Sequence, residues 1–230
     1  MIQRTLGLVA AAAMVLSACG GHAMGWVSQW QDEFDIAKCK LLATGRNDYF
    51  ILEPGFQLVL EGGGERVQIT VLDETKVVDG VTTRVVEERE WKDGKLQEVS
   101  RNYFAICEQT KDVFYFGEDV DIYKDGRVVK HDGAWLAGVN GNRPGLMMPG
   151  TPKPKMKYYQ EIAPGVAMDR AHIISLRETC ATPAGTFADC LKIEESSALE
   201  WFAKDYKYYA PGIGLVRDED LLLVKYGFVK

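Results

Sequence analysis

The sequence has few of the residues and motifs on which catalysis and nucleic-acid binding most often depend. It contains three histidines in 230 residues, and its 27 Lys and Arg are outnumbered by 33 Asp and Glu, for a formal net charge of -6. Affinity for nucleic acid depends on clustered positive charge, so we expect no nucleic-acid partner. The nucleophile elbow G-x-S-x-G, the zinc motif H-E-x-x-H, the P-loop and the dinucleotide glycine fingerprint are all missing. We therefore assign no catalytic residue, no metal ligand and no cofactor.

A long apolar run is also missing. The run from Leu6 to Leu16 is shorter than the roughly 20 residues that a transmembrane helix needs. It follows Arg4 and precedes small residues, which is the order of an export signal. Removal of this signal would leave a chain that can still bury a full core.

The end of the export signal resembles the lipobox of bacterial lipoproteins. Its residues are Leu16-Ser17-Ala18-Cys19, and the resemblance implies cleavage before Cys19, followed by acylation of that cysteine. We therefore expect a lipoprotein signal peptide over residues 1–18, lipidation of Cys19 and an anchor segment over residues 19–48. An ordinary signal peptide cut near Ala23 is the alternative.

The acyl chains would attach the protein to a membrane without help from the fold, since each buried methylene contributes about 0.8 kcal/mol. Gly20 follows the cysteine where an aspartate would indicate retention in the inner membrane. The expected location is therefore the bacterial cell envelope, on the outer membrane and facing the periplasm.

The other four cysteines fall in the exported part of the chain, where an even number predicts disulfides. Cys180 and Cys190 flank a short, turn-rich segment whose closure costs little entropy. We predict that these two are joined and that Cys39 pairs with Cys107, although four cysteines allow three connectivities. No two cysteines are spaced as in a redox or zinc motif.

Alternation of apolar and polar residues dominates the rest of the chain and predicts β-strands. The clearest segments are 67–71, 81–91, 96–107, 172–180, 190–196, 199–209 and 220–228. A helical pattern is found only around residues 30–41, and residues 168–175 are ambiguous. The expected fold is therefore mainly β: a single curved antiparallel meander sheet or half-barrel over residues 49–230, with few short helices.

Turn dipeptides separate the predicted strands. Asp-Gly pairs at 79–80, 93–94 and 125–126 favour type I′ hairpin turns, which need two residues with positive φ. Five prolines, at 54, 144, 149, 164 and 211, are followed by glycine, and this pair favours type II turns.

Three segments resemble an uncharacterised group of bacterial secreted proteins and lipoproteins. They are Tyr49 to Gly55 (YFILEPG), Thr182 to Phe187 (TPAGTF) with the following Cys190, and Tyr208 to Val216 (YYAPGIGLV). A remoter resemblance is to the periplasmic lipoprotein carriers of the Lol type, which implies a curved antiparallel half-barrel with an apolar concave face. These motifs are turn sequences, so the resemblance assigns no catalytic or binding residue to this chain.

Two acidic segments are interpreted as solvent-facing. Glu87, Glu88 and Glu90 fit a solvated sheet face or protection against edge pairing. The segment from Asp169 to His172 could form a general-acid cluster. Alternate residues of a strand face opposite sides, however, so a solvated face explains these residues more simply.

A stretch rich in glycine and proline, residues 137–157, is expected to be one long loop. Its apolar tip, Leu146, Met147 and Met148, is a candidate ligand contact or lid, because thioether side chains adapt to irregular surfaces. The competing interpretation is that this tip plugs the open end of the core.

The sequence as a whole predicts a lipid-anchored envelope protein that acts as a non-catalytic binding or assembly module. Its partner would be an apolar small molecule, a lipoprotein or another envelope protein. The alternatives are an interaction scaffold with a filled core and an envelope hydrolase whose residues meet only in space. A cavity lined by apolar side chains would distinguish a binding module for an apolar small molecule from the scaffold.

Overall fold

The computed structural model describes residues 30–200 and 202–229, most of them in β-strands. Cys19 and the predicted signal peptide lie outside the described residues. One 3₁₀ turn, η1 (Ile36–Lys38), precedes the first strand. The strands are β1 Leu41–Leu42, β2 Gly45–Asn47, β3 Phe50–Leu52, β4 Phe56–Gly62, β5 Glu65–Val78, β6 Val81–Lys92, β7 Lys95–Cys107, β8 Val113–Lys124, β9 Arg127–Lys130, β10 Trp135–Leu136, β11 Arg143–Met148, β12 Lys157–Tyr159, β13 Glu161–Ile162, β14 Asp169–Thr182, β15 Gly185–Ser197, β16 Lys204–Ala210, β17 Gly214–Asp218 and β18 Leu221–Phe228.

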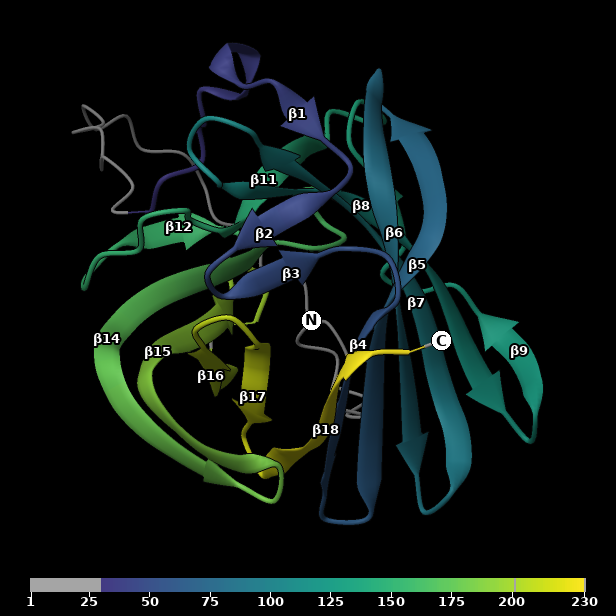
Figure 1. The fold of residues 1–230 in the computed structure, drawn as a ribbon. Helices are drawn as coiled ribbons and strands as arrows, with labels where there is room; N and C mark the ends of the chain where they lie inside the picture. Colours follow the sequence, from purple (N-terminus) through teal and green to yellow (C-terminus); the bar gives the residue numbers. More distant parts are fainter. Residues whose placement is uncertain (1–29, 201, 230) are drawn as a thin grey trace, which may run out of the picture.

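One antiparallel sheet contains every strand except β2 and β3, which form a hairpin of their own. Its strands follow the order β12-β14-β15-β16-β17-β18-β4-β5-β6-β7-β8-β11-β13, with β1, β9 and β10 on side branches. The sheet curls into a nearly closed barrel, with the long strands β5 to β8 on one side and the curved β14 and β15 on the other (Figure 1). The predicted mainly β, antiparallel fold is confirmed.

The two ends of this sheet meet at Gln160. Strand β12 ends at Tyr159 and β13 begins at Glu161, so one residue separates the first strand of the sheet path from the last. The Gln160 amide donates a hydrogen bond of 2.8 Å to the carbonyl of Asp169 on β14. The chain itself therefore links the two edges, and this connection leaves the barrel with an interior.

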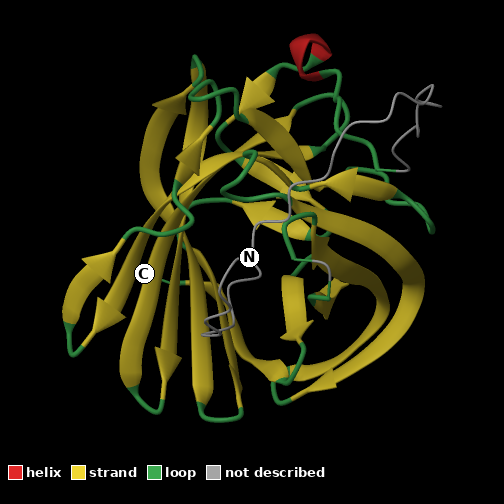
Figure 2. Ribbon diagram, turned by 180° about the vertical axis from the view of Figure 1, so that it is seen from behind, coloured by secondary structure: helices red, strands yellow, loops and turns green. Residues whose placement is uncertain are grey.

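The hairpin turns follow the prediction from Asp-Gly. Asp79, Asp93 and Asp125 have φ of 49°, 49° and 52°, and the glycine after each also has positive φ. They connect β5 to β6, β6 to β7 and β8 to β9, and two of these long hairpins extend from one end of the molecule (Figure 2). Type I′ geometry matches the twist of paired strands, which suits hairpins of this kind.

The Pro-Gly prediction is correct in three places and wrong in two. Gly55, Gly165 and Gly212 have the positive φ that a type II turn requires, whereas Gly145 and Gly150 do not. Gly145 lies inside β11, where a Cβ atom would come within 2.2 Å of the Gln160 carbonyl oxygen. The glycine there permits close approach of two backbones rather than a turn.

Three further expectations need correction. The residues around 30–41 form no α-helix, only the 3₁₀ turn and β1, which pairs with β7. The segment 137–157 is not one loop, because β11 runs through it and pairs with β8. The segment 199–209 becomes a strand only from Lys204. Strands β1 and β11 are fixed by partners far away in sequence, which local patterns do not contain, whereas β16 begins where it pairs with the end of the preceding strand β15.

A disulfide joins Cys39 to Cys107, as predicted. It fastens the segment before β1 to the end of β7, so residues from the expected anchor segment pack on the β domain. The predicted bond between Cys180 and Cys190 is absent: both are free, buried thiols. Cys180 is opposite Phe187 and Cys190 is opposite Glu178, because the β14–β15 register shifts between them. Burial, together with an interaction with the Cys180 thiol, raises the pKa of Cys190 to about 12.

No helix in the described part of the chain is long and apolar enough to span a membrane.

Loss of the Cys39–Cys107 bond is expected to destabilise the domain. The bond closes a chain separation of 68 residues, and restriction of an unfolded loop of this length contributes about 4 kcal/mol in the chain-entropy treatment. The double variant Cys39→Ala/Cys107→Ala should therefore lower the free energy of unfolding by about 2–4 kcal/mol, measured by denaturant titration. Non-reduced peptide mapping should recover Cys39 linked to Cys107; Cys39 joined to a different cysteine would contradict this assignment.

Candidate binding site

A cavity of about 110 Å³ lies inside the barrel. Strands β3 to β7 and β16 to β17 provide most of its wall, and Met147 reaches it from β11. Its apolar lining consists of Phe50, Ile51, Phe56, Leu58, Val67, Ile69, Val71, Val86, Phe104, Met147, Ile213 and Leu215. The barrel core is therefore not filled completely by its own side chains.

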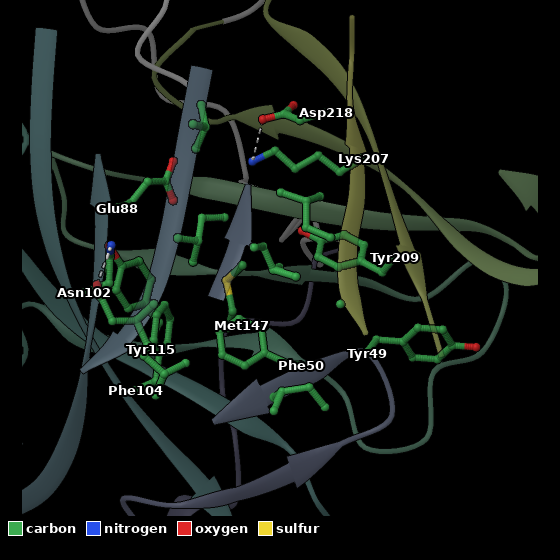
Figure 3. Close-up of a pocket in the computed structure, with 18 of the residues that line it drawn as sticks. Tyr49, Phe50, Glu88, Asn102, Phe104, Tyr115, Met147, Lys207, Tyr209 and Asp218 are labelled. Carbon is green, nitrogen blue, oxygen red and sulfur yellow. Dashed lines mark hydrogen bonds and ion pairs between the residues drawn. The ribbon is translucent and has the colours of Figure 1, made fainter. Parts of the chain in front are cut away.

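The β2–β3 hairpin packs over the apolar end of this cavity. The Phe50 ring lies 5.0 Å from that of Phe104, which in turn stacks at 4.6 Å on Tyr115. Arg46 and Glu53 hold the two arms of the hairpin together through two hydrogen bonds of 2.8 and 2.6 Å. Figure 3 shows these rings and Met147 on one side of the cavity, with Glu88 and Lys207 on the other.

The lining changes from apolar to charged along individual strands. On β6, Val86, Glu88 and Glu90 occupy alternate positions and all three face the cavity. On β7, Phe104 and Asn102 are followed on the same face by Glu98. Because alternate residues of a strand share one face, the cavity lining changes from apolar to acidic along each of these two strands.

A bulge in β8 adds a further carboxylate. Asn102 pairs with Glu118 and Phe104 with Tyr115, so β8 has one residue more than β7 between these pairs. Gly117, with φ of 127°, takes up the irregularity close to the Trp135 carbonyl. The extra residue lets Tyr115 and Glu118, three positions apart, both point inward.

Glu118 lines a smaller cavity of about 80 Å³ next to the first. The two cavities share Glu98, Glu161 and Asp169 as lining residues. Glu118 is 6% exposed, and its Oε2 atom is buried without a hydrogen-bond partner within the described part of the chain. The hydroxyl of the neighbouring Tyr115 donates its hydrogen bond to Asn102 Oδ1.

Lys207 is the single Lys, Arg or His side chain among the described residues that line these two cavities. Its Nζ lies 2.8 Å from Glu195 Oε2 and 4.0 Å from Asp218 Oδ2, and the contact with Asp218 is drawn in Figure 3. The other oxygen of Glu195 accepts a hydrogen bond of 3.1 Å from Gln160 Nε2. Burial by itself would raise the pKa of Glu195, but the Lys207 ammonium lowers it to about 2.

Four other interior glutamates have pKa values raised above the usual range. Burial, together with repulsion from Glu90, raises the pKa of Glu88 to about 8 and that of Glu98 to about 7. Burial and repulsion from Asp169 raise the pKa of Glu161 to about 8. The pKa of Glu118 is also well above normal because of burial and the nearby Glu161. These groups therefore favour the neutral acid form near neutral pH.

The three candidate residues of the apolar tip separate in the structure. Leu146 and Met148 are 4% and 0% exposed and pack in the core. Met147 lines the main cavity, and its Sδ is 3.8 Å from Gln160 Nε2. Of the three, Met147 has the position of a ligand contact.

The acidic wall was not recognised from the sequence. The sequence predicts that Glu87, Glu88 and Glu90 face solvent, yet Glu88 and Glu90 line the cavity. Glu87 lies on the opposite face beside Arg89 but is only 8% exposed, so the prediction is wrong for all three. Asp169, also expected on a solvated face, is 7% exposed and lines both cavities. The available signal was the register: Glu88 and Glu90 continue the alternation set by Val86, although the sequence does not say which face is enclosed.

Residues 155–221 match a family model described as DUF3108-like. The matched range covers less than a third of the chain and includes the segments 182–187 and 208–216, in line with the resemblance to an uncharacterised group. It also contains Gln160, Glu161, Asp169, Glu195 and Lys207 of the cavity region. No curated protein and no solved structure matches this chain. The remoter resemblance to the lipoprotein carriers stays a prediction.

The raised pKa values predict a stability that falls as pH rises. Glu161 has a pKa of about 8 in the folded protein and 4.5 as the ordinary value, so between these pH values the folded state binds the extra proton. The free energy of unfolding should then decrease with pH, by up to about 1.4 kcal/mol per pH unit for each such carboxyl. Denaturant melts from about pH 5 to about pH 9 measure this slope.

The variant Glu161→Gln should flatten the slope, because the amide does not titrate. The exposed Glu74 lies on β5 away from the cavity, and Glu74→Gln is the matched control that should leave the slope unchanged. A slope of opposite sign in this range, or an equal effect of both variants, would contradict the assignment.

Proposed function

We propose that this protein is a non-catalytic binding module of the bacterial cell envelope that holds a small, largely apolar ligand inside its barrel. The observation that carries the proposal is the cavity of about 110 Å³ with its aromatic and aliphatic wall. Binding sites for small molecules are typically concave, mostly apolar and lined by a few polar groups. A scaffold acting through its surface would have no need for an unfilled interior.

The size of the cavity limits the ligand. An engineered apolar cavity of about 150 Å³ in another protein holds benzene, so the main cavity would suit one ring or a short alkyl segment. A second cavity beside it adds about 80 Å³ of more polar space. A complete lipoprotein acyl chain exceeds this space, which favours a small molecule over a carried lipoprotein.

Binding of 1-hexanol, a neutral probe of suitable size, tests the proposal by calorimetry. The variant Ile69→Phe adds volume in the cavity wall and should weaken hexanol binding at least about tenfold, since each 1.4 kcal/mol of lost contact is a factor of ten. Val77 lies on the same strand but is 67% exposed, so Val77→Phe is the matched control and should bind normally. Val86→Ile provides a smaller filling change if Ile69→Phe does not fold.

Failure of the wild-type protein to bind hexanol would overturn the proposal, and so would equal binding by Ile69→Phe and Val77→Phe. Native mass spectrometry with lipid extraction, on protein purified from its own host, should also detect a small co-purifying molecule. Recovery of a large partner protein in place of such a molecule would favour the scaffold.

The envelope location rests on the proposed lipidation of Cys19. Cys19→Ser should remove acylation and shift the protein out of the detergent phase, because serine has no thiol to receive the diacylglyceryl group. Metabolic labelling with a fatty acid measures the acylation directly. Unchanged labelling in this variant would contradict the lipid anchor.

A further inference from the structure

Among the described residues, the interior of the barrel contains far more carboxylates than cations. Cavity-lining or immediately adjacent acids come from eight strands: Glu88 and Glu90 (β6), Glu98 (β7), Glu118 (β8), Glu161 (β13), Asp169 (β14), Glu195 (β15), Asp205 (β16) and Asp218 (β17), with Glu200 at the rim. Lys207 faces them and is already engaged by Glu195 and Asp218. Within the described residues, no Lys, Arg or His forms an ion pair with Glu88, Glu98 or Glu118.

An excess of this kind is costly to the fold. A buried carboxylate without a counter-charge loses its hydration and gains nothing in return. Eliminating the charge by protonation leaves a neutral acid, but an acceptor without a donor still costs free energy when it is buried. The Glu118 Oε2 atom is such an acceptor: it is buried, faces the second cavity and has no partner in the described chain.

We propose that the acidic region shared by the two cavities binds the protonated amine of an amphipathic ligand, whose apolar body lies against Phe104 and Met147. This inference rests on the proposed function, because it names the class of ligand that the same cavity takes. The ammonium would lie between Glu161, Glu98 and Glu118, with Oε2 of Glu118 as one acceptor. The ligand would then extend along the strands, from the acidic end of the cavity toward its apolar end.

The donor chemistry favours an ammonium group. It carries a positive charge and three N–H donors, so it can satisfy several carboxylates spread around a small space. Among the described residues no three His, Cys, Asp or Glu side chains are grouped closely enough to hold a metal ion. A carboxylate or phosphate head is an acceptor with no N–H donors, so it cannot replace the protons on these acids, and it would be repelled by any of them that ionises.

The protonation of the acidic region provides a second signature of ammonium binding. Because burial and mutual repulsion hold protons on Glu88, Glu98, Glu118 and Glu161 near neutral pH, an ammonium must displace protons when it binds to them. A neutral ligand in the apolar part displaces none. Proton release therefore reports occupation of the acidic region specifically.

Three probes with one alkyl chain and different heads separate these possibilities: hexylammonium, 1-hexanol and hexanoate, titrated calorimetrically at about pH 8 in buffers of different ionisation enthalpy. Hexylammonium should bind at least about tenfold tighter than hexanol, as expected for a charge-assisted hydrogen bond. It should also release protons, and hexanoate should bind most weakly. Equal affinity for hexylammonium and hexanol would overturn the inference while leaving the apolar site intact. Failure of all three probes to bind would instead overturn the proposed function.

Substitutions of single glutamates test where the ammonium binds. Glu118→Gln should weaken hexylammonium about tenfold and leave hexanol unchanged, because the amide keeps the shape of the side chain and removes its charge. Glu74→Gln removes the same charge from an exposed position of β5 and should change neither affinity. Loss of both ligands to the same degree in Glu118→Gln would show a structural effect only and would overturn the assignment. Glu98→Gln supplies the same comparison if Glu118→Gln does not fold.

Discussion

Closure of the sheet at Gln160 is the constraint on which the rest of the structure depends. One residue connects the strands at opposite ends of the sheet path, and its backbone is fixed to β14. Its side chain donates to Glu195, whose second oxygen pairs with Lys207. Because Glu195 and Lys207 lie on the neighbouring strands β15 and β16, this network attaches the closing segment to the curved side of the barrel. Without it the concave face would be open to solvent.

Enclosure changes the environment of the carboxylates on the concave face. On an open sheet, Glu88 and Glu90 would be hydrated and their repulsion weak. Inside the barrel they meet Glu98 across the β6–β7 pair and Lys207 from the opposite wall. The environment of Glu88 is low in dielectric and poor in counter-charge, which is why its protonation becomes favourable. Natural proteins tolerate such destabilising groups mainly where function uses them.

The disulfide and the bulge in β8 shape the cavity wall on the side formed by β7 and β8. Cys39 and Cys107 hold the chain before β1 against the end of β7, close to the strands that carry Phe104 and Tyr115. The bulge at Gly117 turns Glu118 inward beside them. Aromatic rings and carboxylates therefore occupy successive levels of the same two strands, which gives the cavity one apolar and one acidic end.

The sequence by itself determined the antiparallel class, the long strands around 67–71, 81–91 and 96–107 and the three Asp-Gly turns, because these depend on local alternation and on positive φ. The Cys39–Cys107 pairing was one of three connectivities that the sequence allowed, and the fold selected it. It did not determine that β11 crosses the segment 137–157, that Cys180 and Cys190 are offset, or that Glu88 and Asp169 face inward. Those features depend on register shifts and on contacts between residues far apart in the chain. A strand's alternation defines two faces, but only the closure of the sheet decides which of them is enclosed.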